Sequence, residues 1–144
     1  MKIFTIGYEK RRIESFIDML IASGVEVVID IRANPYSRIK DFSKKALAAH
    51  LEKSGIEYLH AGELGSPKDL RDKVRDDDDY EYFFVEYEKY LDTQKHVLDD
   101  LARSLEGRTI CLLCLEADEN RCHRKSVAEK LSKVADGAFE VLHL

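Results

Sequence analysis

The chain has 144 residues, of which 44% are hydrophobic and 35% charged, a balance that suits one domain with one core and a hydrated surface. It contains no apolar run of the roughly 20 residues that span a bilayer, and its N-terminal apolar run is too short for a signal peptide, so we expect a cytoplasmic protein with no membrane partner. The net charge of −5 excludes a protein that coats nucleic acid through its overall charge, but residues 31–45 are locally basic and keep a phosphate-bearing partner open.

Apolar strands and amphipathic helices alternate along the first half of the chain. Residues 2–7 form a short β-rich run, and residues 12–24 carry apolar side chains at helical spacing before the stop at Gly24. Residues 25–32 predict a second strand, apolar at consecutive positions as in a sheet buried on both faces. Ser43 is expected to cap a helix that stops at Gly55, and a third strand follows at residues 56–61.

The second half continues the alternation less regularly. Residues 62–79 predict a turn and a short helix, with the acidic run 76–79 as a solvated loop or helix end. One or two helices are expected over 80–107. They are followed by a strand over 108–116, a helix over 122–135 and a final strand over 139–144. This order predicts a single α/β domain over residues 1–144. We expect a three-layer αβα sandwich with a mostly parallel, roughly five-stranded sheet, Rossmann-like or rhodanese-like in broad architecture.

In open α/β sheets, ligands bind outside the carboxyl ends of the strands. The chemically unusual side chains of this chain fall there, and a helix N-terminus near Cys122 would attract anions and lower a thiol's pKa. The candidate catalytic residues are Cys114, Glu116, Cys122 and Asp30. The candidate ligand-binding residues are Gly7, Tyr8, Arg32, Ser37, Arg38, His123 and Arg124, the arginines because a planar guanidinium suits phosphate or carboxylate.

Several of these residues have an alternative interpretation. Three cysteines without a secretion signal indicate reduced thiols, metal ligands or chemistry rather than a disulfide framework, with Cys111 expected in the core. Asp30 would also be explained by an arginine partner that fixes its loop, and His60 could join the rim of the site. A zinc site at Cys114, Cys122 and His123 is chemically acceptable. It is disfavoured because adjacent side chains on a helix diverge by about 100°.

Three segments carry a resemblance to a known family: "TIGYEKRRIESFIDMLIASGVEVVIDIRANPYSRIKDFSKKAL", "GIEYLHAGELG" and "LLCLEADENRCHR…VLHL". Together they resemble the family of the domain of unknown function 488, over the whole of the chain. The resemblance implies a compact α/β domain whose signature residues coincide with the strand-end loops, and it implies no reaction. Members often have a second glycine after Leu-Gly, where this chain has Ser66.

Three functions remain open at this point. We favour an uncharacterised, enzyme-like site for an anionic small molecule, nucleotide or nucleic-acid phosphate. In it, arginines hold the anion, a cysteine is the thiolate, and Glu116 or Asp30 moves protons. The alternatives are a non-catalytic nucleic-acid-binding or regulatory module and a structural zinc site. No cofactor is expected under the favoured interpretation.

Overall fold

The computed structural model describes residues 2–116, 123–134 and 140–144. The strands are β1 (Lys2–Gly7), β2 (Val27–Asp30), β3 (Glu57–His60), β4 (Ile110–Cys114) and β5 (Glu140–His143). The helices are α1 (Ile13–Ala22), α2 (Lys44–Lys53), α3 (Lys68–Asp77), α4 (Tyr80–Asp92), α5 (Lys95–Ser104) and α6 (Arg124–Val134). Two short 3-10 turns, η1 (Lys40–Phe42) and η2 (Gly62–Leu64), precede α2 and α3.

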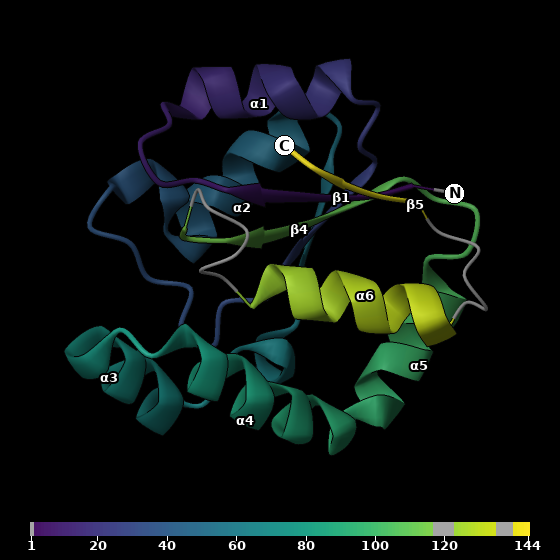
Figure 1. The fold of residues 1–144 in the computed structure, drawn as a ribbon. Helices are drawn as coiled ribbons and strands as arrows, with labels where there is room; N and C mark the ends of the chain where they lie inside the picture. Colours follow the sequence, from purple (N-terminus) through teal and green to yellow (C-terminus); the bar gives the residue numbers. More distant parts are fainter. Residues whose placement is uncertain (1, 117–122, 135–139) are drawn as a thin grey trace.

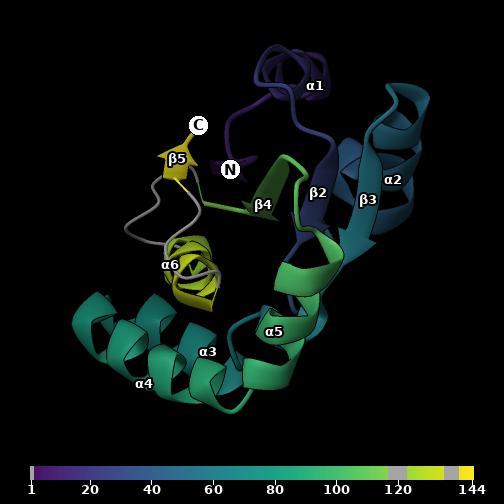
Figure 2. The same cartoon turned by 90° about the vertical axis from the view of Figure 1, so that its right-hand side faces the viewer.

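The five strands form one sheet in the order β3-β2-β4-β1-β5, and every adjacent pair is parallel. Figure 2 shows β5, β4, β2 and β3 following one another across the molecule, in agreement with this order. The predicted α/β sandwich is therefore confirmed, with a sheet that is parallel throughout. A strand from late in the chain, β4, lies between β1 and β2 and pairs with both.

The helices divide between the two faces of the sheet (Figure 1). The steps from β1 to β2 and from β2 to β3 run across the sheet in one direction, and their helices α1 and α2 cover one face. The later steps run the other way, and α3 to α6 lie on the opposite face, as right-handed crossovers require. Each face has its own buried cluster, one around Phe16 and Phe42 and the other around Tyr87 and Leu112.

Side chains explain where several elements begin and end. Gly24 and Gly55 follow α1 and α2 with φ angles of +72° and +77°, a conformation that glycine adopts without strain, so both predicted stops are confirmed. Ser43 occupies the N-cap position of α2, but its hydroxyl makes no capping bond. The predicted N-cap residue is confirmed in position, but its hydroxyl bonds to both backbone groups of Ser37 instead of to the first turn of the helix.

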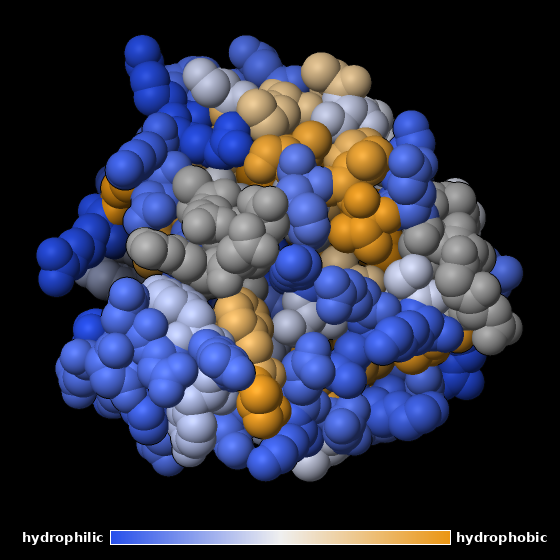
Figure 3. Space-filling model, viewed as in Figure 1, coloured by the Kyte–Doolittle hydropathy of each residue, from blue (hydrophilic) through white to orange (hydrophobic). Residues whose placement is uncertain are grey.

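The acidic run at residues 76–79 is exposed and marks a helix junction. Asp78 closes α3 in a left-handed conformation, and the Asp79 side chain accepts a bond from the Tyr82 amide at the start of α4. Figure 3 shows a largely hydrophilic face, with hydrophobic residues gathered beside β5. Among the described residues, no helix is both long enough and apolar enough to cross a bilayer.

Candidate functional site

The carboxyl ends of the strands meet at one edge of the sheet. The register pairs Gly7 with Cys114 and Asp30 with Leu113 and His60, so the last residues of β1 to β4 lie within one residue of a common row. Helices on opposite faces of the sheet follow β4 and its neighbours β1 and β2, and such a change of face opens a crevice at the strand ends. The fold therefore brings together the loops that the sequence singled out.

A pocket of about 500 Å³ opens at this edge, on the side covered by α3 and α4. The loops that follow β1, β2, β3 and β4 form its walls, together with helices α3 and α4. The lining residues are Tyr8, Arg32, Ala33, Asn34, Tyr36, Ser66, Arg71, Val74, Arg75, Tyr80, Phe83, Leu115, Glu116 and His123. Four of the predicted site residues (Tyr8, Arg32, Glu116 and His123) are among them.

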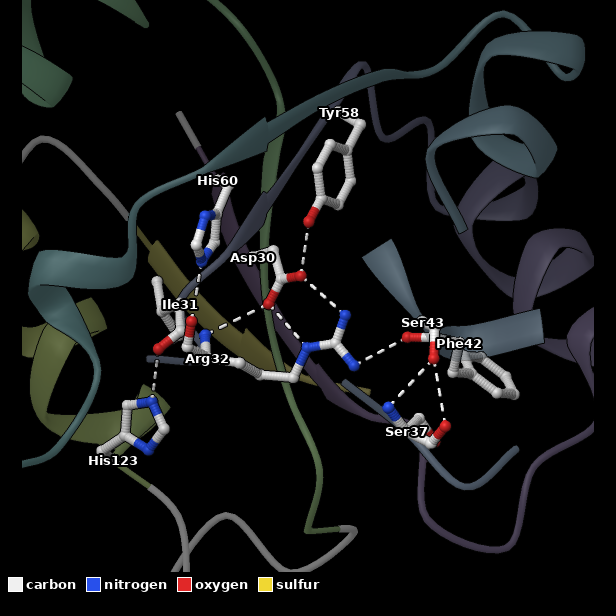
Figure 4. A network of polar contacts seen from close by, with 9 residues as sticks. All are labelled: Asp30, Ile31, Arg32, Ser37, Phe42, Ser43, Tyr58, His60 and His123. Atoms are coloured by element: carbon white, nitrogen blue, oxygen red, sulfur yellow. Dashed lines mark hydrogen bonds and ion pairs between the residues drawn. The ribbon is translucent and has the colours of Figure 1, made fainter. Parts of the chain in front are cut away.

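Asp30 and Arg32 form a buried ion pair behind the pocket (Figure 4). Nε and Nη2 of Arg32 donate to the two carboxylate oxygens of Asp30 at 2.8 and 2.7 Å, and the Tyr58 hydroxyl donates to the same carboxylate at 2.6 Å. Burial alone would lower the pKa of Arg32, but the bonds and charge of Asp30 outweigh it and raise the pKa. This geometry matches the structural interpretation of Asp30, with its negative charge already neutralised.

The same carboxylate ends the strand. The Arg32 amide donates to Asp30 Oδ1 at 3.1 Å, which turns the backbone away from the sheet. The second strand, Val27–Asp30, is shorter than the predicted 25–32 by two residues at each end, and this side-chain bond accounts for its end at Asp30.

Two histidines hold the backbone that follows β2. His123 Nε2 donates to the Ile31 carbonyl at 2.8 Å, and His60 Nε2 donates to the Arg32 carbonyl at 2.8 Å (Figure 4). Burial lowers the pKa of His123 to about 4, so its imidazole is neutral at neutral pH. Both rings thus position the loop, and the His123 and Tyr87 rings pack edge to face with centroids 5.5 Å apart.

Aromatic packing continues this framework toward the pocket floor. Tyr8 stacks on Phe42 with ring centroids 4.7 Å apart, and the Arg32 guanidinium lies over the Tyr8 ring at 5.2 Å. Nη1 of Arg32 also donates to the Phe42 carbonyl at 2.7 Å. Ser37 is used within the same loop, where its hydroxyl accepts from the Ile39 amide. Arg38 is exposed and is not among the described residues that line the pocket.

Arg124 is fully buried, and its guanidinium donates inward. Nε bonds to Thr5 Oγ1 at 3.2 Å, and Nη1 bonds to Cys114 Sγ at 3.3 Å and to the Glu116 carbonyl. Gly7 explains how this loop comes so close, since a Cβ there would lie 1.7 Å from the Glu116 carbonyl oxygen. Gly7 and Arg124 were predicted to bind ligand. In the structure, the bonds of Arg124 and the close approach at Gly7 hold the loop after β4 against β1.

The cysteines differ from the expectation of reduced thiols. Cys111 is free and fully buried, as predicted, and burial raises the pKa of its thiol. Cys114 is also fully buried, and its sulfur belongs to a disulfide, whereas a reduced thiol was expected. The predicted site residue Cys122 lies outside the described residues. No group of three potential metal ligands occurs among the residues that the structure does describe.

Glu116 is the predicted acid–base residue that does line the pocket. Burial raises the pKa of its carboxyl group, opposed by the nearby positive charges of Arg124 and Arg71. A carboxyl group in such a setting keeps its proton at a higher pH than an exposed glutamate.

The residues on the α3 and α4 side of the pocket were not predicted from the sequence. Arg71 and Arg75 lie four residues apart on α3 and both line the cavity. Nε of Arg71 is the one buried side-chain nitrogen or oxygen in the described part of the chain with no hydrogen-bond partner. The spacing of four in "RDKVR" could have indicated a cationic helix face, because such residues share one side of a helix.

Comparison with known proteins adds a family but no reaction. The family described as "Domain of unknown function DUF488" matches residues 12–131. No curated protein matches the chain. A crystal structure of a DUF442 protein from Shewanella putrefaciens, described as a candidate phosphatase, is similar with 12% identity and a TM-score of 0.46; the match covers 94% of this chain and 87% of that one.

Proposed function

The chain belongs to the family of the domain of unknown function DUF488, whose name assigns no reaction. We propose from the pocket that the protein binds a ligand with a negatively charged group, above all a phosphate ester. The ligand would lie at the C-terminal edge of the sheet, between the strand ends and α3. This retains the class of ligand expected from the sequence and changes the residues that hold it.

The observation that carries the proposal is the unpaired Nε of Arg71. A buried donor without an acceptor costs about 1–3 kcal/mol, and more when the group is charged. A guanidinium offers two parallel N–H groups that match two oxygens of a phosphate or carboxylate. A bound oxyanion would supply the acceptor that the described residues do not.

Arg75 adds a second cation one helical turn away. It pairs with Asp72 at 3.0 Å, but this pair is largely exposed, and exposed pairs contribute little and exchange readily. Arg32, by contrast, adds little net charge to the pocket because Asp30 neutralises it. The attraction for an anion should therefore come mainly from α3.

Glu116 suits the role of proton donor to a bound ester. Its raised pKa keeps the carboxyl group protonated to a higher pH than an exposed glutamate, and the protonated form does not repel an anion and can protonate a leaving oxygen. A role for sulfur chemistry at Cys114 and Cys122 would first require reduction of Cys114. To distinguish proton donation by Glu116 from sulfur chemistry, turnover of a phosphate monoester is compared between reduced wild-type protein and Cys114→Ser. Unchanged turnover in the variant would show that the Cys114 sulfur takes no part in the reaction.

Calorimetric titration with inorganic phosphate tests the anion site. Arg71→Gln should weaken binding at least about tenfold, since a hydrogen bond to a charged group contributes about 1.5–3 kcal/mol. The matched control is Arg103→Gln, which removes an exposed arginine paired to Asp100 on α5 and should change nothing. Unchanged phosphate affinity in Arg71→Gln would refute the proposal.

A titration with sulfate tests the role of Glu116. The charge of sulfate does not change near neutral pH, so only protein groups alter its binding. Affinity should fall as the pH rises through the elevated pKa of Glu116, because the ionised carboxylate repels the anion. Glu116→Gln should remove this part of the pH dependence.

A further inference from the structure

The loop after β2 presents an aromatic ring at the pocket. Tyr36 lines the cavity, yet 69% of the residue is exposed, the largest value among the exposed hydrophobic residues described. Ile39, three residues later, is 48% exposed. A flat ring held in water beside a binding pocket is a surface on which another planar group can stack.

The backbone around this ring is fixed by its own hydrogen bonds. The Tyr36 amide donates to the Asn34 carbonyl at 2.8 Å, and the Lys44 amide donates to the Pro35 carbonyl at 3.0 Å. The bonds between Ser37 and Ser43 join the two sides of the loop (Figure 4). Because the loop is already ordered, binding there loses little conformational freedom.

The same loop carries a local excess of positive charge. Arg38, Lys40, Lys44 and Lys45 are all exposed, and none of the four forms an ion pair within the described residues. The one acidic residue in this stretch, Asp41, pairs with His50 at 3.0 Å. The chain as a whole has a net charge of −5, so this basic loop differs in sign from the molecule that carries it.

We propose that the ligand is the phosphate-bearing end of a single-stranded nucleic acid. Its terminal phosphate occupies the site at Arg71, a base stacks on Tyr36, and further phosphates follow the basic loop, residues 36–45. Unspecific single-strand binding sites combine these two elements, a stacking ring and a cationic path for the backbone. The placement of the terminal phosphate rests on the proposed function; the stacking ring and the cationic path do not.

The test compares three ligands by fluorescence anisotropy or calorimetry: inorganic phosphate, thymidine monophosphate and a short oligothymidine with a terminal phosphate. The oligonucleotide should bind at least about tenfold more tightly than the mononucleotide, because only it reaches all four cations. Its affinity should fall with salt with a log–log slope near −3.5, from about −0.7 for each of five neutralised phosphates, one at Arg71 and four at the basic loop.

Variants separate the stacking ring from the cationic path. Lys44→Gln with Lys45→Gln should make the salt slope shallower by about 1.4, or 0.7 for each lysine, and leave mononucleotide binding unchanged. Lys53→Gln, at the far end of the same helix, is the matched control. Tyr36→Ala should weaken oligonucleotide binding at least about fivefold, whereas Tyr36→Phe keeps the ring and the affinity.

Equal affinity for mononucleotide and oligonucleotide would overturn the inference, as would equal affinity for a duplex, whose bases are not free to stack on Tyr36. The phosphate titration of Arg71→Gln keeps this failure distinct from that of the proposed function. If Arg71 binds phosphate and the oligonucleotide has no advantage, only the inference fails. If phosphate does not bind at all, the proposed function fails. The salt slope of oligonucleotide binding and the Tyr36 variants then still test whether a single strand binds along the stacking ring and the basic loop.

Discussion

Replacement of Asp30 by alanine should destabilise the protein strongly. The carboxylate is fully buried and accepts four hydrogen bonds, three from Arg32 and one from Tyr58. Its removal leaves the Arg32 guanidinium charged and only 6% exposed. Breaking a buried ion pair from one side costs about 3–5 kcal/mol, a large part of the about 5–15 kcal/mol that stabilises a typical domain.

Urea unfolding followed by circular dichroism measures this loss. The control Asp100→Ala breaks an exposed pair and should change the free energy of unfolding by less than about 0.5 kcal/mol. In an Arg32→Met background, Asp30→Ala should cost much less, because no buried cation remains to be left unpaired. A loss below about 1 kcal/mol in the wild-type background, or the same loss in both backgrounds, would contradict the reasoning.

Three further outcomes follow from the same contacts. His123 has a folded pKa of about 4 against an ordinary value of 6.5, so the unfolded chain binds more protons between these values. Stability should therefore fall as the pH drops through this window, by about 3 kcal/mol in total, and His123→Asn should lack this component in unfolding curves at several pH values. Gly7→Ala should lower the melting temperature because its Cβ would lie 1.7 Å from the Glu116 carbonyl oxygen, whereas Gly62→Ala should lower it less in the same melt, because its Cβ meets the His60 ring at 3.0 Å and the Ala33 carbonyl oxygen at 3.6 Å. Cys111 should react with iodoacetamide only after unfolding, since it is fully buried with a raised pKa; modification of the native protein, detected by mass spectrometry, would show that its strand opens.

The fold could be predicted well because its signals are local. Consecutive apolar residues in β2 and β4 and glycines after α1 and α2 each reflect a nearby physical requirement. The order of the strands could not be predicted, since nothing in the sequence of β1 or β2 shows that β4 lies between them. The sequence of a strand shows whether both of its faces are buried, but it does not show which strand pairs beside it in the sheet.

The strand-end loops that line the pocket could be predicted from the sequence, but the partners of their side chains could not. A charged residue at a strand end looks the same whether it faces a ligand or a partner. Arg32 and Arg124 turned out to hold Asp30 and the loop after β4. Arg71 and Arg75 escaped notice because α3 is distant in sequence from the strand ends and is brought to them only by the tertiary fold. Whether an arginine faces a ligand or a protein group depends on residues that are distant in sequence and close in the fold. The spacing of residues along the chain therefore does not predict it.

The position of β4 in the sheet has a consequence for synthesis. In the described sheet β1 pairs only with β4 and β5, so a nascent chain that ends before residue 110 has no partner for its first strand. On the ribosome, the N-terminal β-strand must remain unpaired until more than a hundred residues have been added. Contacts of such long sequence separation slow folding and expose apolar segments to aggregation meanwhile. Truncation before β4 should therefore give insoluble fragments rather than a smaller folded unit.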